Sequence, residues 1–306
     1  MLGDVAKLAA MFALPAPLAA LGRFESTARG APEPALADDP DRARLTTWAA
    51  KLRSEGLAGS AAPIGRATAR VGELAIGTPY EAYTLEAYLR AGGSASTTEP
   101  LTLSLTRFDC VTLVESSLAI ARVARSRGAP SWEGLAHEVE RMRYRDGTRG
   151  SYASRLHYFS EWITDGERRG LLRDLGGELG GVDDARPLRF MTEHRGSYVA
   201  LADDGVFQAI GATERRLDGR TRKVIPTAHI ADVADRIQTG DVLAFATSIP
   251  GLDVTHTALA YRDERGILRV LHAPLSGGTV EVSRATLPDY VAAIRRSTGI
   301  LVARPL

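Results

Sequence analysis

Three side chains of this 306-residue chain have the types found in a thiol hydrolase: Cys110, His256 and His272. A thiolate is a strong nucleophile, an imidazole can take its proton, and a second polar group can orient that imidazole. Cys110 is the only cysteine, so it cannot form an internal disulfide. Because most lone cysteines are small buried hydrophobic residues, the thiol alone does not indicate catalysis.

The segment Cys110–Arg127 predicts a helix that begins at the cysteine. Asp109 is a good N-cap residue, and Thr112 with Glu115 has the spacing of a capping box. The unpaired amide groups and the dipole of a helix N-terminus favour a thiolate. Such a position can lower the pKa of a thiol from about 8.5 toward neutrality, so we expect an activated thiol at Cys110.

The two histidines fall on neighbouring predicted strands. His256 lies in the alternating segment Val254–Asp263, and His272 ends the next strand. On its strand His256 shares a predicted face with Val254, Ala258 and Ala260. Pairing Tyr261 with Ile267 around a five-residue loop would place the histidines opposite each other, about 5 Å apart at Cβ. A slip of one residue would separate them onto opposite faces.

The remaining pattern predicts helices first and strands last, which indicates an α+β domain. Expected helices are Leu45–Leu57, Trp132–Arg143, Leu156–Arg168 and Thr286–Arg296. Expected strands are Leu101–Leu105, Asp241–Thr247, Val254–Asp263, Gly266–Pro274, Gly278–Ser283 and Gly299–Pro305, and a further strand is expected to end at Thr192–His194. The strands of the C-terminal third would form an antiparallel meander.

The N-terminal region is predicted to be separate from this domain. Lys7–Gly22 is an apolar run of signal-peptide length, too short and too interrupted by proline to span a membrane. Glu25–Arg44 has the composition of a flexible linker. We therefore expect a signal-like segment and linker over residues 1–44, a single domain over 45–306, and an exported or periplasmic protein without stable membrane insertion.

Composition limits the partners. The 37 acidic and 38 basic residues nearly cancel, and no basic block stands out, so nucleic acid is not expected as a partner. Nothing in the sequence indicates an oligomer, and we expect a monomer.

Several motifs, taken in order, resemble one family. They are "GTPYEAYTLE", "FDCVTLVESSLAIAR", "SRLHYFSEWI", "GLDVTHTALAY", "LRVLHAP" and "TGILVARP", spread over about Leu45 to Pro305. This set is similar to the N-acetylmuramoyl-L-alanine amidase-like branch of the papain-like, NlpC-type cell-wall cysteine peptidases.

The resemblance implies a papain-like NlpC-type fold, in which a Cys-bearing helix packs on an antiparallel sheet. A long family-specific insertion would separate the Cys helix from the His strand. The resemblance also implies roles for Cys110 as nucleophile, His256 as general base and His272 as the residue that orients it. The implied reaction is hydrolysis of the amide between N-acetylmuramic acid and L-alanine, in peptidoglycan or a muropeptide, with no metal and no cofactor.

Candidate substrate contacts are weaker predictions. Arg155 and His157 could meet a substrate carboxylate, and Tyr158 and Trp162 could stack on a sugar, although aromatic residues at helical spacing are more often core. The complete set of candidates in the predicted substrate site is Tyr80, Asp109, Arg155, Tyr158, Trp162, Glu193 and His194. Of these, Tyr80 rests on the resemblance alone.

Three alternatives remain open from the sequence. Cys110, His256, His272 and an acid could bind zinc, although their spacing matches no compact zinc motif. The chain could be a non-catalytic cell-wall binding module. It could also be an endopeptidase that cuts the stem peptide after D-glutamate, because the same triad serves both bonds.

Overall fold

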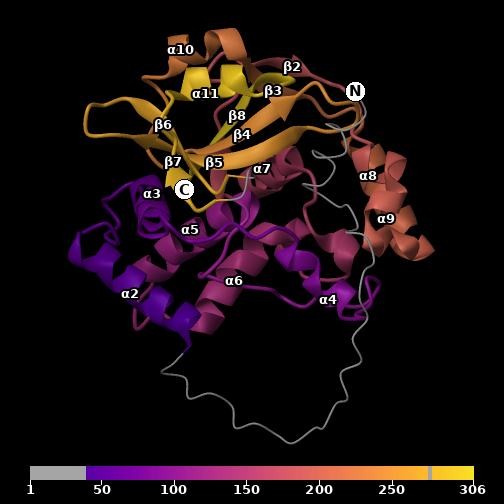
Figure 1. Ribbon diagram of the computed structural model, residues 1–306, viewed down its shortest axis with the longest axis horizontal. Helices are drawn as coiled ribbons and strands as arrows, with labels where there is room; N and C mark the ends of the chain where they lie inside the picture. The colour runs from indigo at the N-terminus through magenta and orange to yellow at the C-terminus, as the bar shows by residue number, and fades with distance from the viewer. Residues whose placement is uncertain (1–38, 275–277) are drawn as a thin grey trace, which may run out of the picture.

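The computed structural model describes residues 39–274 and 278–306, and it has an α+β fold in which helices cover an antiparallel sheet (Figure 1). The helices are α2 (Pro40–Ser54), α3 (Ile64–Leu74), α4 (Ala87–Arg90), α5 (Cys110–Arg125), α6 (Trp132–Arg143), α7 (Phe159–Arg168), α8 (Phe190–Glu193), α9 (Asp204–Leu217), α10 (Ile230–Val233) and α11 (Leu287–Ala293). The strands are β1 (Leu172–Asp174), β2 (Val182–Asp184), β3 (Arg222–Pro226), β4 (Val242–Thr247), β5 (Val254–Arg262), β6 (Leu268–His272), β7 (Glu281–Val282) and β8 (Ser297–Pro305).

The sheet runs in the order β2-β3-β8-β4-β5-β6-β7, with β1 paired to β8. The predicted meander is present from β4 to β7, and its three strand pairings are antiparallel. The last strand does not continue the meander, because β8 lies between β3 and β4. The C-terminal strand therefore joins the two halves of the sheet.

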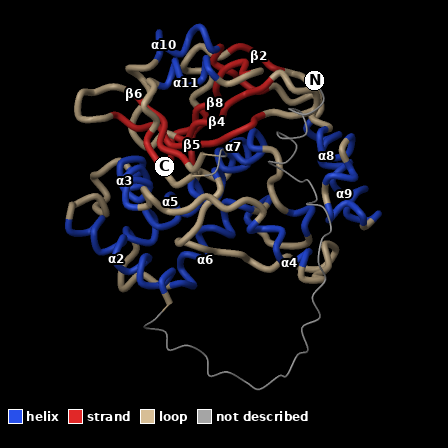
Figure 2. The backbone as a smooth tube through the Cα atoms, in the orientation of Figure 1, coloured by secondary structure: helices blue, strands red, loops and turns tan. Residues whose placement is uncertain are grey.

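Helices cover the two faces of the sheet unequally, as Figure 2 shows. One face packs against α2, α3 and α5 through a large apolar core that includes Leu118, Leu259 and Leu301. The other face is covered by α10 and α11, where a separate core includes Phe245. Because α5 contacts helices on several sides as well as β5, nearly all of its side chains are buried.

Val254 does not share a face with His256 as predicted, because a β-bulge lies between them at Thr255. Val254 pairs with Ala246 and belongs to the core on the α5 side, whereas His256 pairs with Phe245. The extra residue between the two pairs reverses the alternation, so Val254 and His256 point to opposite faces. His256 shares its face with Ala258 and Ala260, as predicted, but not with Val254.

The predicted register between β5 and β6 is wrong by two residues. Tyr261 pairs with Arg269 rather than Ile267, and the last pair before the turn is Arg262 with Leu268. The carboxylate of Asp263 accepts hydrogen bonds from amides of the turn, which fixes the turn one residue further along the chain. Since the shift is even, the two histidines stay on one face, now as diagonal neighbours.

Other boundaries differ in detail. The helices at Cys110 and at Trp132–Arg143 are confirmed, the first ending at Arg125. Leu101–Leu105 is not a strand: the amide of Leu105 donates to the Asp41 carboxylate instead of to a sheet neighbour. Thr192–His194 follows a short helix, α8, and not a strand.

The N-terminal boundary also differs from the prediction. Asp39 caps α2, so the helix begins at Pro40, inside the predicted linker. The apolar segment Lys7–Gly22 lies outside the described residues. No helix in the described part of the chain is long and apolar enough to cross a membrane.

Candidate active site

Cys110 is the first residue of α5, and local hydrogen bonds fix that helix start. The Asp109 carboxylate accepts from the amide of Thr112 at 2.7 Å, and the Thr112 hydroxyl accepts from the amide of Asp109 at 2.9 Å. The capping box is therefore Asp109–Thr112, not the predicted Thr112–Glu115 pair. Glu115 forms a buried ion pair with Arg143 at 2.8 Å.

The thiol of Cys110 is neutral in this structure, contrary to the expectation of an activated thiolate. Burial, and secondarily the nearby Asp109 carboxylate, raises the pKa of Cys110 to about 12. The amides of Thr257 and Val111 face the sulfur and act in the opposite direction, as does the Thr257 hydroxyl, but burial outweighs them. The sequence pattern predicted where the helix starts, but not how deeply the packed sheet buries the thiol of Cys110.

His256 and His272 form a direct pair. Nε2 of His256 and Nδ1 of His272 are 2.8 Å apart, and the rings meet edge to face. Burial lowers the pKa of His256 well below its usual value, with a smaller effect from His272. Burial also lowers the pKa of His272 to about 4, so both rings are neutral near pH 7. The ring of His256 stacks on Phe245, which limits its rotation.

Cys110 contacts β5 at Thr257, the residue that follows His256. The ladder to β6 covers only Leu259–Arg262, and ahead of it the amide of Thr257, next in sequence to His256, faces the sulfur. Nδ1 of His256 is buried and has no hydrogen-bond partner in residues 39–274 and 278–306. No hydrogen bond joins the thiol to the ring here; catalytic hydrogen bonds often form only when substrate is bound.

A cavity of about 110 Å³ opens beside Cys110. Four of the seven predicted substrate contacts line it: Tyr80, Asp109, Arg155 and Tyr158. Segments distant in sequence meet there, because Tyr80 bridges to Phe108, two residues before the thiol.

The three other predicted contacts do not line this cavity. Trp162 is 3% exposed and stacks on Phe159 in the core, as the alternative interpretation of the aromatic spacing proposed. Glu193 is exposed on α8, and His194 stacks on Phe190 while its Nδ1 lies 2.8 Å from that residue's carbonyl oxygen.

The sequence analysis missed several wall residues. They are Tyr83, Glu86, Tyr152 and Tyr198. Tyr83 and Glu86 lie within or next to "GTPYEAYTLE", and Tyr152 and Tyr198 lie close to the segments that carried other candidates. The density of tyrosine in those segments was the available signal.

The polar side chains in the cavity wall are mostly held by protein partners. Arg155 is paired with Glu99, which is 1% exposed, and with the more exposed Glu86. The hydroxyl of Tyr158 donates to Glu214 at 2.7 Å. These partners hold Arg155 and Tyr158 in place, and several of the other side chains in the wall are aromatic.

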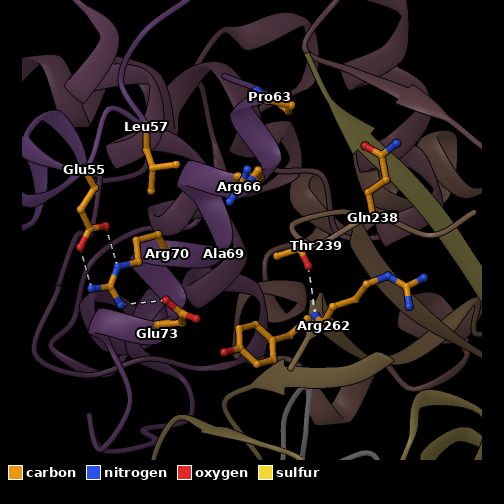
Figure 3. A pocket seen from close by; sticks show the side chains of 11 residues that line it. Glu55, Leu57, Pro63, Arg66, Ala69, Arg70, Glu73, Gln238, Thr239 and Arg262 are labelled. Atoms are coloured by element: carbon orange, nitrogen blue, oxygen red, sulfur yellow. Dashed lines mark hydrogen bonds and ion pairs between the residues drawn. The ribbon is translucent and has the colours of Figure 1, made fainter. Parts of the chain in front are cut away.

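A larger cavity, about 650 Å³, lies elsewhere, between α3 and the far end of β5 (Figure 3). Its wall contains no cysteine or histidine. Arg70 is bound to Glu55 and Glu73, and the guanidinium of Arg262 donates to backbone carbonyls such as that of Gly266. Arg70, Glu55 and Glu73 therefore link α2 to α3. Cys110 lines the smaller cavity, whose wall includes neither His256 nor His272.

Within the described residues, no group of three or more Cys, His, Asp or Glu side chains is arranged to hold a metal ion.

The sequence profile of the N-acetylmuramoyl-L-alanine amidase-like family matches residues 70–300. The chain belongs to this family. No curated protein sequence matches it.

Solved structures agree with the family assignment. An N-acetylmuramoyl-L-alanine amidase from Bacteroides uniformis is 30% identical, with 79% of this chain and 99% of that chain covered and a TM-score of 0.71. A Bacteroides fragilis protein described as a putative xylanase is 32% identical, with 76% and 99% covered and a TM-score of 0.68. A Legionella pneumophila protein at 18% identity, covering 89% and 96% with a TM-score of 0.62, shares the fold.

Proposed function

We propose that the protein is a cysteine-dependent amidase that hydrolyses the bond between N-acetylmuramic acid and L-alanine in peptidoglycan fragments. The family match and the amidase from Bacteroides uniformis support the reaction class. The observation that supports the cysteine mechanism is the buried His256–His272 pair. Nδ1 of His256, which has no hydrogen-bond partner among the described residues, belongs to β5, the strand that contacts Cys110.

The first half-reaction forms a thioester. His256 Nδ1 takes the proton of the Cys110 thiol as Sγ bonds to the lactyl carbonyl carbon of the muramic acid. The carbonyl becomes an oxyanion, which the amide of Cys110, without an acceptor in the helix, is placed to stabilise. Collapse of this intermediate breaks the C–N bond, and His256 gives its proton to the amine of L-alanine.

The second half-reaction releases the sugar acid. Water loses a proton to His256 and adds to the thioester carbonyl, and Sγ leaves and regains its proton. His272 holds the imidazole through the 2.8 Å contact at Nε2. Since both partners are neutral at rest, the thiol loses its proton during attack rather than beforehand.

The proposal also includes the fold type, the location and the oligomeric state of the protein. We place the fold in the papain-like NlpC type, because a helix bearing cysteine at its start packs on an antiparallel sheet bearing histidine. A peptidoglycan substrate favours an exported or periplasmic enzyme acting as a monomer. The cavity of about 110 Å³ has room for a small part of the substrate, such as an alanyl side chain with its neighbouring amide.

The test is mass spectrometry of a defined muropeptide incubated with wild type, Cys110→Ala and His256→Ala. His229→Ala, at an exposed histidine, is the matched control. We expect wild type and the control to release the whole stem peptide with a free L-alanine amine, and the two site variants to release none.

Other outcomes separate the alternatives. Cleavage after D-glutamate would keep the thiol mechanism but move the bond. Equal cleavage by wild type and Cys110→Ala would refute the nucleophile. No cleavage by any protein would favour a binding module.

A further inference from the structure

The carboxylate of Glu281 lies next to His272 of the histidine pair. His256, His272 and Glu281 lie on the successive strands β5, β6 and β7, and His272 and Glu281 are direct register partners. Nε2 of His272 is buried and has no hydrogen-bond partner among residues 39–274 and 278–306, and it lies 3.8 Å from Oε1 of Glu281. The three side chains therefore form a row on one face of the sheet, with Glu281 at its exposed end.

Protons on this row can be arranged in only two ways. A neutral imidazole carries one N–H, so each ring donates at one nitrogen and accepts at the other. If His272 has its proton at Nε2, its Nδ1 accepts from Nε2 of His256, and Nδ1 of His256 is left with a lone pair. If His272 has its proton at Nδ1, the pair reverses, and Nδ1 of His256 is protonated and cannot act as a base.

The neighbours of His272 favour the first arrangement. An ionised carboxylate is only an acceptor, so Glu281 stabilises a proton at Nε2. The Tyr290 hydroxyl from α11 lies 3.4 Å from Nδ1 of His272, where it can act as a weaker second donor to the lone pair that accepts from His256 in this arrangement. Phe245 from β4 contributes only its apolar ring, which stacks on His256. From α5, Cys110 contacts Thr257, the residue that follows His256.

We propose that Glu281 is a positioning residue that fixes the tautomers of His272 and His256, and so leaves Nδ1 of His256 able to accept the proton of the thiol. This inference rests on the proposed function for its catalytic consequence, but the tautomers themselves do not depend on the substrate. Glu281 does not contact the reacting atoms. It acts through His272.

The direct test is nitrogen NMR of the imidazoles in the full-length protein at neutral pH without substrate. Long-range proton–nitrogen spectra identify the protonated nitrogen of each ring, and His256→Asn and His272→Asn assign the signals. We expect wild type to show protonated Nε2 on both rings. Glu281→Gln, whose amide can donate to Nε2, should populate the reversed form, whereas Glu264→Gln in the exposed β5–β6 turn should not.

Kinetics provide the second readout. We expect Glu281→Gln to lower kcat about tenfold with little change in KM. This effect is far smaller than the 10⁴-fold loss of kcat known for a buried, hydrogen-bonded carboxylate in a triad. The difference is expected because Glu281 is 57% exposed and is not within hydrogen-bond distance of His272. Glu281→Asp should restore part of kcat. The acid limb of the pH profile of kcat should also shift in Glu281→Gln but not in Glu264→Gln.

The outcomes separate the two proposals. Unchanged tautomers in Glu281→Gln, or a wild type that already has the reversed form, would overturn the role of Glu281. A wild type that cleaves no muropeptide but whose tautomers change in Glu281→Gln would refute the amidase while leaving the role of Glu281 in the histidine pair intact.

Discussion

The reactivity of the thiol in the absence of substrate is a direct test of how Cys110 is activated. The pKa of Cys110 is raised from 9.0 to about 12, mainly by burial. At pH 8 about one ordinary thiol in ten is ionised, against about one in 10⁴ for Cys110. This thousandfold difference corresponds to about 4 kcal/mol. Because only the thiolate reacts, alkylation should be slow and should speed up about tenfold with each pH unit, without a plateau below pH 10.

The assay is simple because the chain has one cysteine, so every alkylation event reports on Cys110. The rate constant with iodoacetamide would be measured by mass spectrometry from pH 5 to pH 10.5. Protein unfolded in urea is the control, and its rate should level off near pH 8.5 to 9. Limited access lowers the rate equally at all pH values and so leaves the slope unchanged. A plateau beginning between pH 4 and 7 and abolished in His256→Gln would refute this account, because it would reveal a pre-formed thiolate–imidazolium pair.

Two further predictions concern stability, each with a matched control. Glu115→Gln leaves the Arg143 cation buried without its partner, so we expect the free energy of unfolding to fall by about 3–5 kcal/mol and the Tm in calorimetry to fall by about 6–15 °C. Glu178→Gln removes a partner from an exposed ion pair and should cost less than about 1 kcal/mol. Equal effects of the two variants would contradict a stabilising role for the buried pair. Gly240 has a φ of +88°, and in Gly240→Ala the new Cβ would overlap the backbone of the first turn of α3, so we expect little soluble protein. Gly266→Ala is the control, because Gly266 has a similar φ of +76° but open space around it. This control should fold with a loss of about 1 kcal/mol in the free energy of unfolding, as measured by urea unfolding.

Local signals in the sequence predicted several elements correctly, although the strands expected at Leu101–Leu105 and before His194 are absent from the described residues. The start of α5 follows from Asp109, whose side chain caps the helix as its residue type indicates. Trp132–Arg143 and the strands β4, β5 and β6 follow from strong periodicity and from the glycine and proline clusters between them. These features depend on neighbours within a few residues, which a sequence displays directly.

Long-range features could not be predicted in the same way. The position of β8 between β3 and β4 depends on pairings across the whole domain. The pKa of the thiol depends on how deeply several elements bury Cys110, and this reversed the expectation drawn from the helix N-terminus. The aromatic wall of the cavity combines residues from Tyr80 to Tyr198, and no spacing rule connects them.

The same limit applies to the hairpin of the two histidines. The five-residue loop length was right, but the Asp263 turn set its position, and only the even size of the shift kept His256 and His272 together.

The bulge at Thr255 decides which side chains of β5 face which core. If Thr255 paired regularly with β4, Val254 and every side chain before it would cross to the face of His256, because one residue reverses the alternation of a strand. Deleting Thr255 would instead make Val254 and His256 adjacent, and adjacent residues of a strand point to opposite faces, as these two do now. The bulge therefore absorbs one residue between His256 and the loop whose Leu252 lines the cavity beside Cys110, without exchanging the two faces of the sheet.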